Sequence, residues 1–436
     1  METQNQETMK KAIALTLLMC IALIINAQQR AEIEFTNLTE KPNWQTAVLE
    51  VPLVEIKPFL AYSVSWKGEA NKIKIRFSYN GIHWSSWTEV GQDKHSDGTN
   101  LKVTQLGYVE KDVNFFQIAG EQTAKEVVLH LYNPGATEER PEDVAASEVI
   151  NSRTCECTIP SFQDRAGWCP SGTCPEHPDP AFTNVSHLII HHSAGTNISD
   201  DWAAVVRSIW DFHVNTRGWS DIGYNWLIDP DGVVYQGRGN DWIGAHFCGA
   251  NSNTMGVCVL GNFTTEEPTI DAEESLKELL AWKSCESSID PEGVSFHSST
   301  GMDLDNISGH KDGCATACPG EAFYPSIPDL RAEVADYIAS NCQTTDVEIA
   351  DGEFAKVKYY PNPTQGEVKV ELPASFSGMR LELINLSSKE LHKAATLSPI
   401  SAHQTYKLDL TPYPAGMYLI RLEGKGKDAV FKLVKN

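Results

Sequence analysis

His187-Leu-Ile-Ile-His-His192 is the stretch that decides the fold of this 436-residue chain. Its apolar run, Leu188-Ile-Ile190, predicts a buried β-strand. Two histidines follow at the point where the apolar run ends, and functional sites gather at such sheet edges. Because successive strand residues face opposite ways, only one of His191 and His192 can normally take part in a site there.

The sequence around this strand, over residues 151–342, predicts an α/β (α+β) region. Two further apolar segments predict strands at 224–229 and 255–260, and Asp229-Pro-Asp-Gly232 predicts a tight hairpin turn between strands. Amphipathic spacing predicts three helices: one capped by Ser199 and ending near Gly218, one at 272–284 and one at 327–339. We expect a central mixed sheet flanked by these helices.

The composition excludes several classes of function. With 35 Lys and Arg against 58 Asp and Glu, the chain carries a formal charge of −23. This surplus argues against nucleic acid as a partner and against electrostatic docking on an anionic bilayer. An apolar content of 41% with 11 Trp excludes a disordered chain, and 11 Cys favour an oxidising compartment, a metal site, or both.

The amino terminus predicts export. Met9-Lys10-Lys11 precedes an apolar run from Ala12 to Ile25, and Ala27 is a small residue at the expected cleavage point. This pattern is typical of a secretory signal peptide over residues 1–27. The run is shorter than the ~20 residues that a bilayer-spanning helix needs, so we expect no membrane span.

All-β regions are predicted on both sides of the α/β region. Residues 30–150 alternate apolar and polar side chains in short runs, which predicts a β-sandwich. Its Trp84-Ser-Ser-Trp87 motif fits either a carbohydrate-stacking face or ordinary packing between strands. After an acidic linker at 343–356, residues 357–436 contain no Cys or Trp and predict a second, smaller β-sandwich.

His191 or His192, His310 and Cys318 form a candidate metal site. A hydrolytic zinc site needs about three protein ligands and an open position for water. His310 and Cys318 flank a turn-prone segment that is short enough to bring both side chains to one ion. Each alone has a plainer interpretation, a hydrogen-bonded histidine or a disulfide cysteine, so the prediction depends on the combination.

Six ordered blocks resemble a known family. They are His187-Leu-Ile-Ile-His-His-Ser-Ala194, Gly218-Trp-Ser-Asp-Ile-Gly-Tyr-Asn-Trp-Leu-Ile228, Val234-Tyr-Gln-Gly-Arg-Gly239, Gly244-Ala-His246, Gly256-Val-Cys-Val-Leu-Gly-Asn-Phe263 and the segment from Gly309-His310 to Cys318-Pro-Gly320. Together they are similar to type 2 N-acetylmuramoyl-L-alanine amidases, in the branch shared with peptidoglycan recognition proteins. The resemblance covers about residues 160–342.

The resemblance implies a role for eight residues. His191, His310 and Cys318 would hold Zn²⁺, and Tyr224 would be the catalytic tyrosine. Thr316 stands where phage-lysozyme-type members have a lysine and recognition proteins usually have threonine, and it would help to orient the reacting groups. Asn225, Arg238 and His246 would line the substrate groove. Many members read Gly-Trp-Asn where this chain has Gly239-Asn240-Asp241, which bears on its stem-peptide preference.

The implied activity is zinc-dependent hydrolysis of peptidoglycan. Water activated by the metal would attack the amide between the lactyl group of N-acetylmuramic acid and L-alanine. Two alternatives remain: a non-catalytic peptidoglycan-binding module, although such members typically lack the ligand cysteine, and a zinc hydrolase of another amide.

The cysteine count is consistent with a metal-bound Cys318. Apart from Cys20 in the signal peptide and Cys318, nine cysteines remain, so at least one stays outside an intramolecular bridge. Cys258, in the middle of an apolar strand, is the best candidate for a buried free thiol. Among the other eight, we expect a Cys285–Cys314 pair, and Cys248 and Cys314, both unusual in the family that the motifs resemble, are further candidates for disulfide partners.

The C-terminal region carries a second resemblance. Tyr359-Tyr-Pro-Asn-Pro-Thr-Gln-Gly366, Pro414-Ala-Gly-Met-Tyr-Leu-Ile-Arg421 and Lys432-Leu-Val-Lys435 are similar to the sorting domain of the type IX secretion system. This resemblance implies export across the outer membrane by that machinery, to the cell surface or the medium. The alternative is an ordinary carbohydrate-binding or adhesion β-sandwich.

Overall fold

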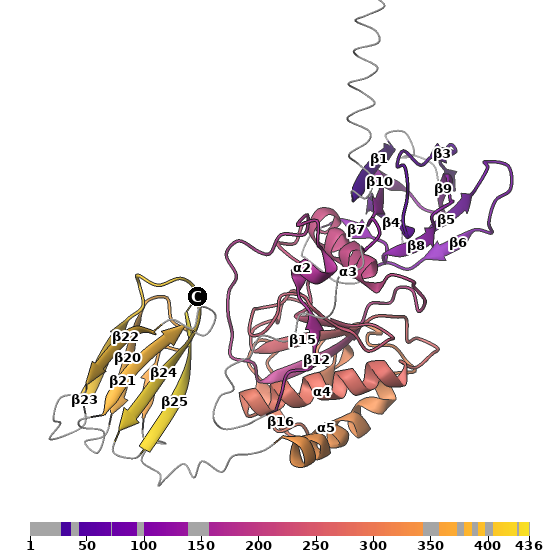
Figure 1. Cartoon of the computed structure of the whole chain (residues 1–436). Helices are drawn as coiled ribbons and strands as arrows, with labels where there is room; N and C mark the ends of the chain where they lie inside the picture. Colours follow the sequence, from indigo (N-terminus) through magenta and orange to yellow (C-terminus); the bar gives the residue numbers. More distant parts are fainter. Residues whose placement is uncertain are drawn as a thin grey trace, which may run out of the picture.

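Three regions of regular structure follow one another along the chain (Figure 1). The structure, a computed structural model, describes residues 28–35, 43–70, 72–93, 100–137, 157–342, 357–372, 379–385, 391–396, 404–424 and 427–435. The expected signal peptide and the expected linker lie outside the described residues.

The first region is all-β, as expected, and its described residues hold no helix. One antiparallel sheet has the order β1-β10-β4-β7, with β8 also paired to β4, and the other has the order β2-β9-β5-β6, with β3 paired to β9. Buried side chains from both sheets, such as Leu129 and Phe116, meet in one apolar cluster. The strands are β1 (Gln29–Phe35), β2 (Trp44–Gln45), β3 (Leu49–Glu50), β4 (Phe59–Gly68), β5 (Ile73–Ser78), β6 (Thr88–Val90), β7 (Lys102–Val103), β8 (Gly107–Glu110), β9 (Phe115–Gly120) and β10 (Ala124–Asn133).

The two tryptophans of the 84–87 motif lie against one cation. The guanidinium carbon of Arg76 is 4.8 Å from the ring centroid of Trp84 and 4.7 Å from that of Trp87. Arg76 lies on β5, so these contacts tie the motif to the sheet. One face of each indole is therefore already occupied, which favours the packing interpretation of the motif.

A six-stranded mixed sheet forms the centre of the second region, as predicted. Its order is β11-β14-β13-β15-β12-β18; β12 runs parallel to both of its neighbours, whereas β13 and β14 are antiparallel. The strands are β11 (Phe162–Gln163), β12 (His187–His192), β13 (Trp226–Ile228), β14 (Val234–Gln236), β15 (Thr254–Val259) and β18 (Ile307–Gly309), and β16 (Val294–His297) pairs with β17 (Met302–Asp305) outside it. The hairpin turn between β13 and β14 is the predicted one, with Gly232 at φ +80°.

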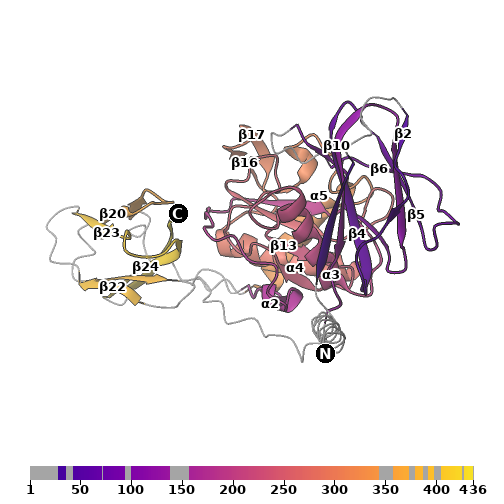
Figure 2. The ribbon, with the colours of Figure 1, turned by 90° about the horizontal axis from the view of Figure 1, so that it is seen from above.

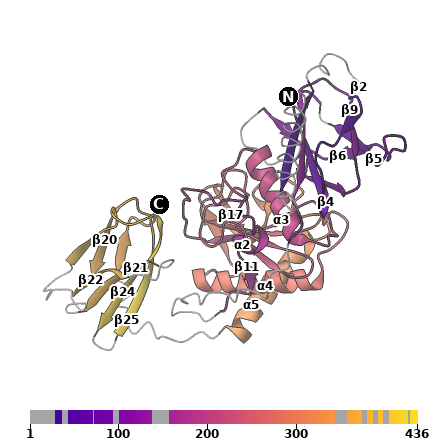
Figure 3. The same cartoon turned by 45° about the horizontal axis from the view of Figure 1, so that its top comes forward.

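Helices cover both faces of this sheet (Figures 1 and 3). Helices α4 (Ile270–Ser287) and α5 (Ile327–Asn341) pack on one face, against Leu188, Ile190 and Val257. Helix α3 (Trp202–Asp211), which continues as the π-helical turn η1 (Phe212–Thr216), packs on the other face with Leu227 and Cys258. The short elements are α2 (Arg165–Trp168), η2 (His310–Asp312) and η3 (Tyr324–Ser326).

The start of α3 differs from the prediction. Asp201, not Ser199, is the N-cap, because its carboxylate accepts a hydrogen bond from the Ala204 N–H at 2.8 Å. The hydroxyl of Ser199 instead accepts from the N–H of Asp201 at 3.1 Å, so it holds the capping residue in place.

The third region is also all-β. One of its sheets has the order β19-β20-β23 and the other β22-β21-β24-β25, and apolar residues from both, including Val370 and Leu381, form one cluster. The strands are β19 (Lys358–Tyr360), β20 (Glu367–Leu372), β21 (Arg380–Asn385), β22 (Leu391–Thr396), β23 (Gln404–Asp409), β24 (Gly416–Gly424) and β25 (Lys427–Lys435).

Within the described ranges, no helix combines the length and apolarity needed to cross a bilayer.

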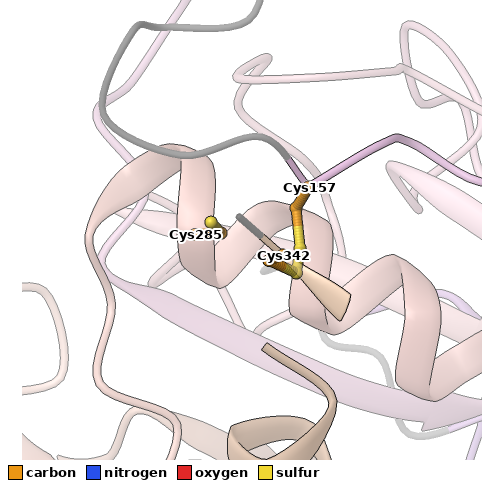
Figure 4. Close-up of side chains that lie close together, drawn as sticks. All are labelled: Cys157, Cys285 and Cys342. Carbon is orange, nitrogen blue, oxygen red and sulfur yellow. A yellow bond between two sulfur atoms is a disulfide. The ribbon is translucent and has the colours of Figure 1, made fainter. Parts of the chain in front are cut away.

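The disulfides correct one prediction. Cys314 pairs with Cys248, so the expected Cys285–Cys314 bridge is wrong. The physical reason is position: Cys285 lies near the end of α4, where its sulfur is close to the Cys157–Cys342 disulfide (Figure 4). A third bridge joins Cys169 to Cys174. Cys258 is a buried free thiol, as predicted.

Candidate metal centre and active-site pocket

Strand pairing brings His191 and His310 to one edge of the central sheet. His191 is near the end of β12, and His310 directly follows β18. The two strands are parallel neighbours in which Ile190 is paired with Gly309. The residues that follow this pair, His191 and His310, are therefore placed side by side by the register of the sheet.

Cys318 completes a buried trio with these two histidines. One ligand atom from each of His191, His310 and Cys318 lies within 4.8 Å of the others. The Sγ of Cys318 is 3.7 Å from Nδ1 of His191, and the rings of His191 and His310 have centroids 4.5 Å apart. Cys318 is a free thiol, so its sulfur is available to a metal. Two imidazoles and one sulfur within reach of one point form a donor set that suits Zn²⁺.

The protein around the trio disfavours a bare thiolate. Burial raises the pKa of the Cys318 thiol to about 12, although the backbone N–H of His192 donates to the sulfur at 3.3 Å and acts in the opposite direction. A thiolate at this depth needs a cation beside it. The electrostatics therefore suit a metal ion.

His192, the second histidine of the pair, lies outside the trio. Its Nδ1 accepts a hydrogen bond from the N–H of Phe263 at 3.2 Å. The alternation of the strand thus directs only one of the two adjacent imidazoles to the trio, as the sequence pattern predicts.

Tyr224 lies beside the trio, two residues before β13. Its ring centroid is 5.3 Å from that of His191, and its side chain is buried but lines the pocket. Burial, followed by the nearby Cys258 and Cys318 sulfurs, raises the pKa of the Tyr224 phenol well above its usual range. The phenol therefore keeps its proton and can donate a hydrogen bond.

Thr316 lies on the segment that carries Cys318. It lines the same pocket, and its hydroxyl accepts a hydrogen bond from the N–H of Cys318 at 3.2 Å. The Thr316 hydroxyl therefore fixes the backbone of Cys318, and Thr316 itself borders the pocket.

His246 contacts the trio directly. Its Nδ1 is 3.0 Å from Nε2 of His191, and its Nε2 is 3.3 Å from the hydroxyl of Thr254. A Cβ on Gly256 would lie 2.5 Å from the His246 ring, so only glycine at that position leaves room for it. His246 lines the pocket, but its two ring nitrogens face protein atoms.

Asn225 and Arg238 are not among the residues that line the pocket. The amide nitrogen of Asn225 donates to the carbonyl oxygens of Gly239 and Trp242 at 2.9 and 2.8 Å. The guanidinium of Arg238 donates to the carbonyl oxygens of Ile222 and Ile243, both at 2.7 Å. These side chains therefore tie the backbone segments behind the pocket together.

The unusual Gly239-Asn240-Asp241 segment faces α4. The ammonium group of Lys283 is fully buried and lies 2.7 Å from the Asp241 carboxylate and 2.6 Å from that of Glu286. Burial opposes the charge on Lys283, but the two carboxylates raise its pKa. Asn240 donates to the same Glu286. Asp241 is therefore part of a buried ion pair with Lys283, and Asn240 hydrogen-bonds to the second carboxylate of that cluster, Glu286.

The pocket in front of the trio has a volume of about 530 Å³. His213 and Trp219 line it and stack on each other, with ring centroids 4.5 Å apart. The sequence analysis did not predict His213 and Trp219 as site residues. Two signals could have identified them: Trp219 lies in one of the motif blocks, and His213 follows Trp210 by one helical turn. Residues of the N-terminal all-β region also line the pocket, and no motif marked them.

Two families match the chain. The family described as N-acetylmuramoyl-L-alanine amidase matches residues 181–321, and the secretion system C-terminal sorting domain matches residues 358–436. The second match indicates export to the cell surface or secretion.

Curated relatives match the central region. Peptidoglycan-recognition protein SC2 of Drosophila simulans is 34% identical over 145 residues, which are 33% of this chain and 72% of that protein. An N-acetylmuramoyl-L-alanine amidase of Sus scrofa is 30% identical over 202 residues, which are 45% of this chain and 31% of that protein. The chain thus spans about a third of the length of that amidase.

Among solved structures, wild-type Drosophila PGRP-LB aligns over 38% of this chain and 91% of that chain, with 29% identity and a TM-score of 0.32. From the ordered motifs, the family match and the coverage of the SC2 relative, the chain belongs to the family of N-acetylmuramoyl-L-alanine amidases and peptidoglycan recognition proteins.

Proposed function

We propose that this protein is an exported, zinc-dependent N-acetylmuramoyl-L-alanine amidase. It would hydrolyse the amide that joins the lactyl group of N-acetylmuramic acid to the L-alanine of the stem peptide. The observation that carries this proposal is the buried trio of His191, His310 and Cys318, of which His310 and Cys318 line a pocket and the cysteine sulfur is in no disulfide.

The trio suits one zinc ion with an open side toward the pocket. Zinc, when bound, supplies a Lewis acid and lowers the pKa of a coordinated water to about 7. The two imidazoles would bind as neutral ligands and the cysteine as a thiolate, so zinc binding would release the proton of the buried Cys318 thiol.

Tyr224 would supply the hydrogen bond that the reaction needs. Its phenol stays protonated because burial raises its pKa, and its ring lies beside His191. A phenol held there can donate to the carbonyl oxygen of the scissile amide as negative charge develops on it. Such a donor stabilises the transition state more than the ground state, so its contribution appears in kcat.

His246 and Thr316 would act as positioning residues. The imidazole of His246 faces Nε2 of His191 at 3.0 Å, which fixes the orientation of the His191 ring and leaves Nδ1 for the metal. Thr316 holds the backbone of Cys318. We assign Asn225 and Arg238 a supporting role behind the pocket, because their polar atoms bind backbone carbonyls.

The flanking regions would serve export and substrate handling. We propose that residues 1–27 are a secretory signal peptide and that residues 357–436, joined by the linker at 343–356, are recognised by type IX secretion machinery. The match to a C-terminal sorting domain supports this route. The paired sheets of residues 30–150 and of the C-terminal region, each around a shared apolar cluster, support a β-sandwich for both.

Digestion of purified sacculi tests the activity. The expected product is stem peptide with a new L-alanine amino terminus, released by the zinc-loaded protein and not after removal of zinc with a chelator. A pure binding module would retain sacculi and release nothing, and a hydrolase of another amide would expose a different amino terminus. Either result would overturn the proposal.

A further inference from the structure

The pocket has two walls of different origin. His192, Tyr224 and Thr316 belong to the central region, whereas Gln92 and Gln105 belong to the N-terminal all-β region. The amidase family match begins only at residue 181, so the second wall is outside it. We call this second wall, made of Gln92, Asp93, Gln105, Leu106 and Tyr108, the β wall.

Apolar packing fixes the β wall against the central region. Leu106 and Tyr108 pack on the cluster that contains α3 and Tyr224. The Tyr108 ring lies so close to Gly195 that a Cβ there would be 3.1 Å from its edge, and Tyr108 also packs edge-on against Phe59. The wall is therefore set by packing and is not a loose loop.

Polar contacts fix the same interface. Asp93 lies 3.7 Å from the Arg217 guanidinium, and the side chain of each is largely buried. The fully buried Arg207 of α3 donates to the carbonyl oxygens of Pro134 and Gly135 at 3.0 and 2.8 Å. Arg30 of β1 pairs with Asp211 at the end of α3. The views in Figures 1 and 2 agree that this all-β region lies against α3.

The chemistry of the β wall indicates what it can bind. Asp93 is matched by Arg217, which leaves the amides of Gln92 and Gln105 as its neutral polar groups, beside the apolar surface of Leu106 and Tyr108. Primary amides both donate and accept hydrogen bonds, so they suit hydroxyl, acetamido and peptide groups rather than ionised ones. Peptidoglycan offers all three.

We propose that the β wall binds substrate, and that Gln92 and Gln105 contact neutral hydrogen-bonding groups of peptidoglycan next to the scissile amide. This inference rests on the proposed function. It gives the N-terminal all-β region a direct part in substrate selection, because the amidase region alone would leave that side of the pocket open.

The test measures kinetics and binding on the full mature chain. Gln92→Ala and Gln105→Ala, singly and together, are compared with Gln45→Ala, an exposed glutamine of β2 that does not line the pocket. Substrates are N-acetylmuramoyl-tripeptide and the corresponding disaccharide-tripeptide. The double variant should raise KM about fivefold to tenfold with kcat within about twofold, and Gln45→Ala should leave both unchanged.

The outcomes separate this inference from the proposed function. A rise confined to the disaccharide substrate assigns the β wall to the glycan, and an equal rise for both assigns it to the lactyl-peptide part. Wild-type KM in the double variant for both substrates would overturn the inference while leaving the amidase proposal intact. If the wild type binds these ligands without cleaving them, the amidase proposal fails, and the same comparison of Kd values decides the inference.

Discussion

Nε2 of His191 and Nδ1 of His246 face each other at 3.0 Å, with their rings edge to face. If Nδ1 of His191 binds the metal, its Nε2–H donates to His246, which then donates from Nε2 to the hydroxyl of Thr254. This chain of hydrogen bonds would then hold the His191 ring in one orientation and one tautomer.

His246→Ala should therefore weaken zinc binding, by about 10- to 100-fold. Competition with a chromophoric chelator measures this affinity directly. His213→Ala is the matched control, because His213 lines the same pocket without belonging to the trio. An unchanged zinc affinity with a raised KM would instead assign His246 to substrate binding.

Cys318→Ala should lose zinc and activity together. Removing the sulfur leaves two imidazoles, too few to hold the ion in the expected tetrahedral site. Metal content by mass spectrometry and sacculus digestion measure the two effects. Cys258→Ala removes the other buried free thiol and should keep one zinc per chain. Full turnover by a metal-free Cys318→Ala protein would contradict the proposed mechanism.

Tyr224→Phe should keep the metal and lose turnover. The variant retains the ring that packs beside His191 but lacks the hydroxyl donor. Loss of one donor to a developing oxyanion costs about 10²–10³ in kcat. Steady-state kinetics on a soluble muropeptide give kcat and KM separately. A variant with wild-type kcat would leave Tyr224 with a packing role only.

His130 should make stability fall in mild acid. It is buried on β10, where Ser65 contacts its Nε2 at 2.8 Å, and burial, followed by the charge of Arg30, lowers its pKa to about 4. Between pH 6.5 and pH 4 the unfolded chain takes up a proton that the folded chain does not. The free energy of unfolding should therefore fall as the pH falls through this window, by up to about 3 kcal/mol.

Urea unfolding at pH 7 and at pH 4.5 measures this effect. The His130→Asn variant lacks the titrating group, so its stability should fall less between the two pH values than that of the wild type. Equal losses in both proteins would show that His130 does not titrate differently in the folded and unfolded states.

The central sheet was predictable because its strands are short apolar runs that can be identified from the local sequence alone. The apolar run at 188–190 needs no tertiary context to be identified as a strand, and alternation alone limits the trio to one histidine of the pair at 191 and 192. The proximity of His191 and His310 depends on strand register, which the sequence pattern does not specify. Only the resemblance to the amidase family predicted that these two histidines lie together.

Long-range pairing was less accessible from the sequence. The partner of Cys314 depends on which loop packs against the segment that carries it. The resemblance marked both Cys248 and Cys314 as unusual, but spacing along the chain did not distinguish Cys248 from Cys285 as the partner. The β wall lies where two regions meet, and it is made of two glutamines, an aspartate, a leucine and a tyrosine. No periodicity or motif distinguishes these residues from any other surface positions.

The Cys157–Cys342 disulfide joins residues at the two ends of the described central region. Any tension between the chain before residue 157 and the chain after residue 342 is carried across that covalent bond. Tension applied at these two cysteines therefore has a covalent path that bypasses the backbone between them. A chain pulled through a secretion channel by its tail, or tethered to a surface by it, would thus place less of the load on the backbone of the central region.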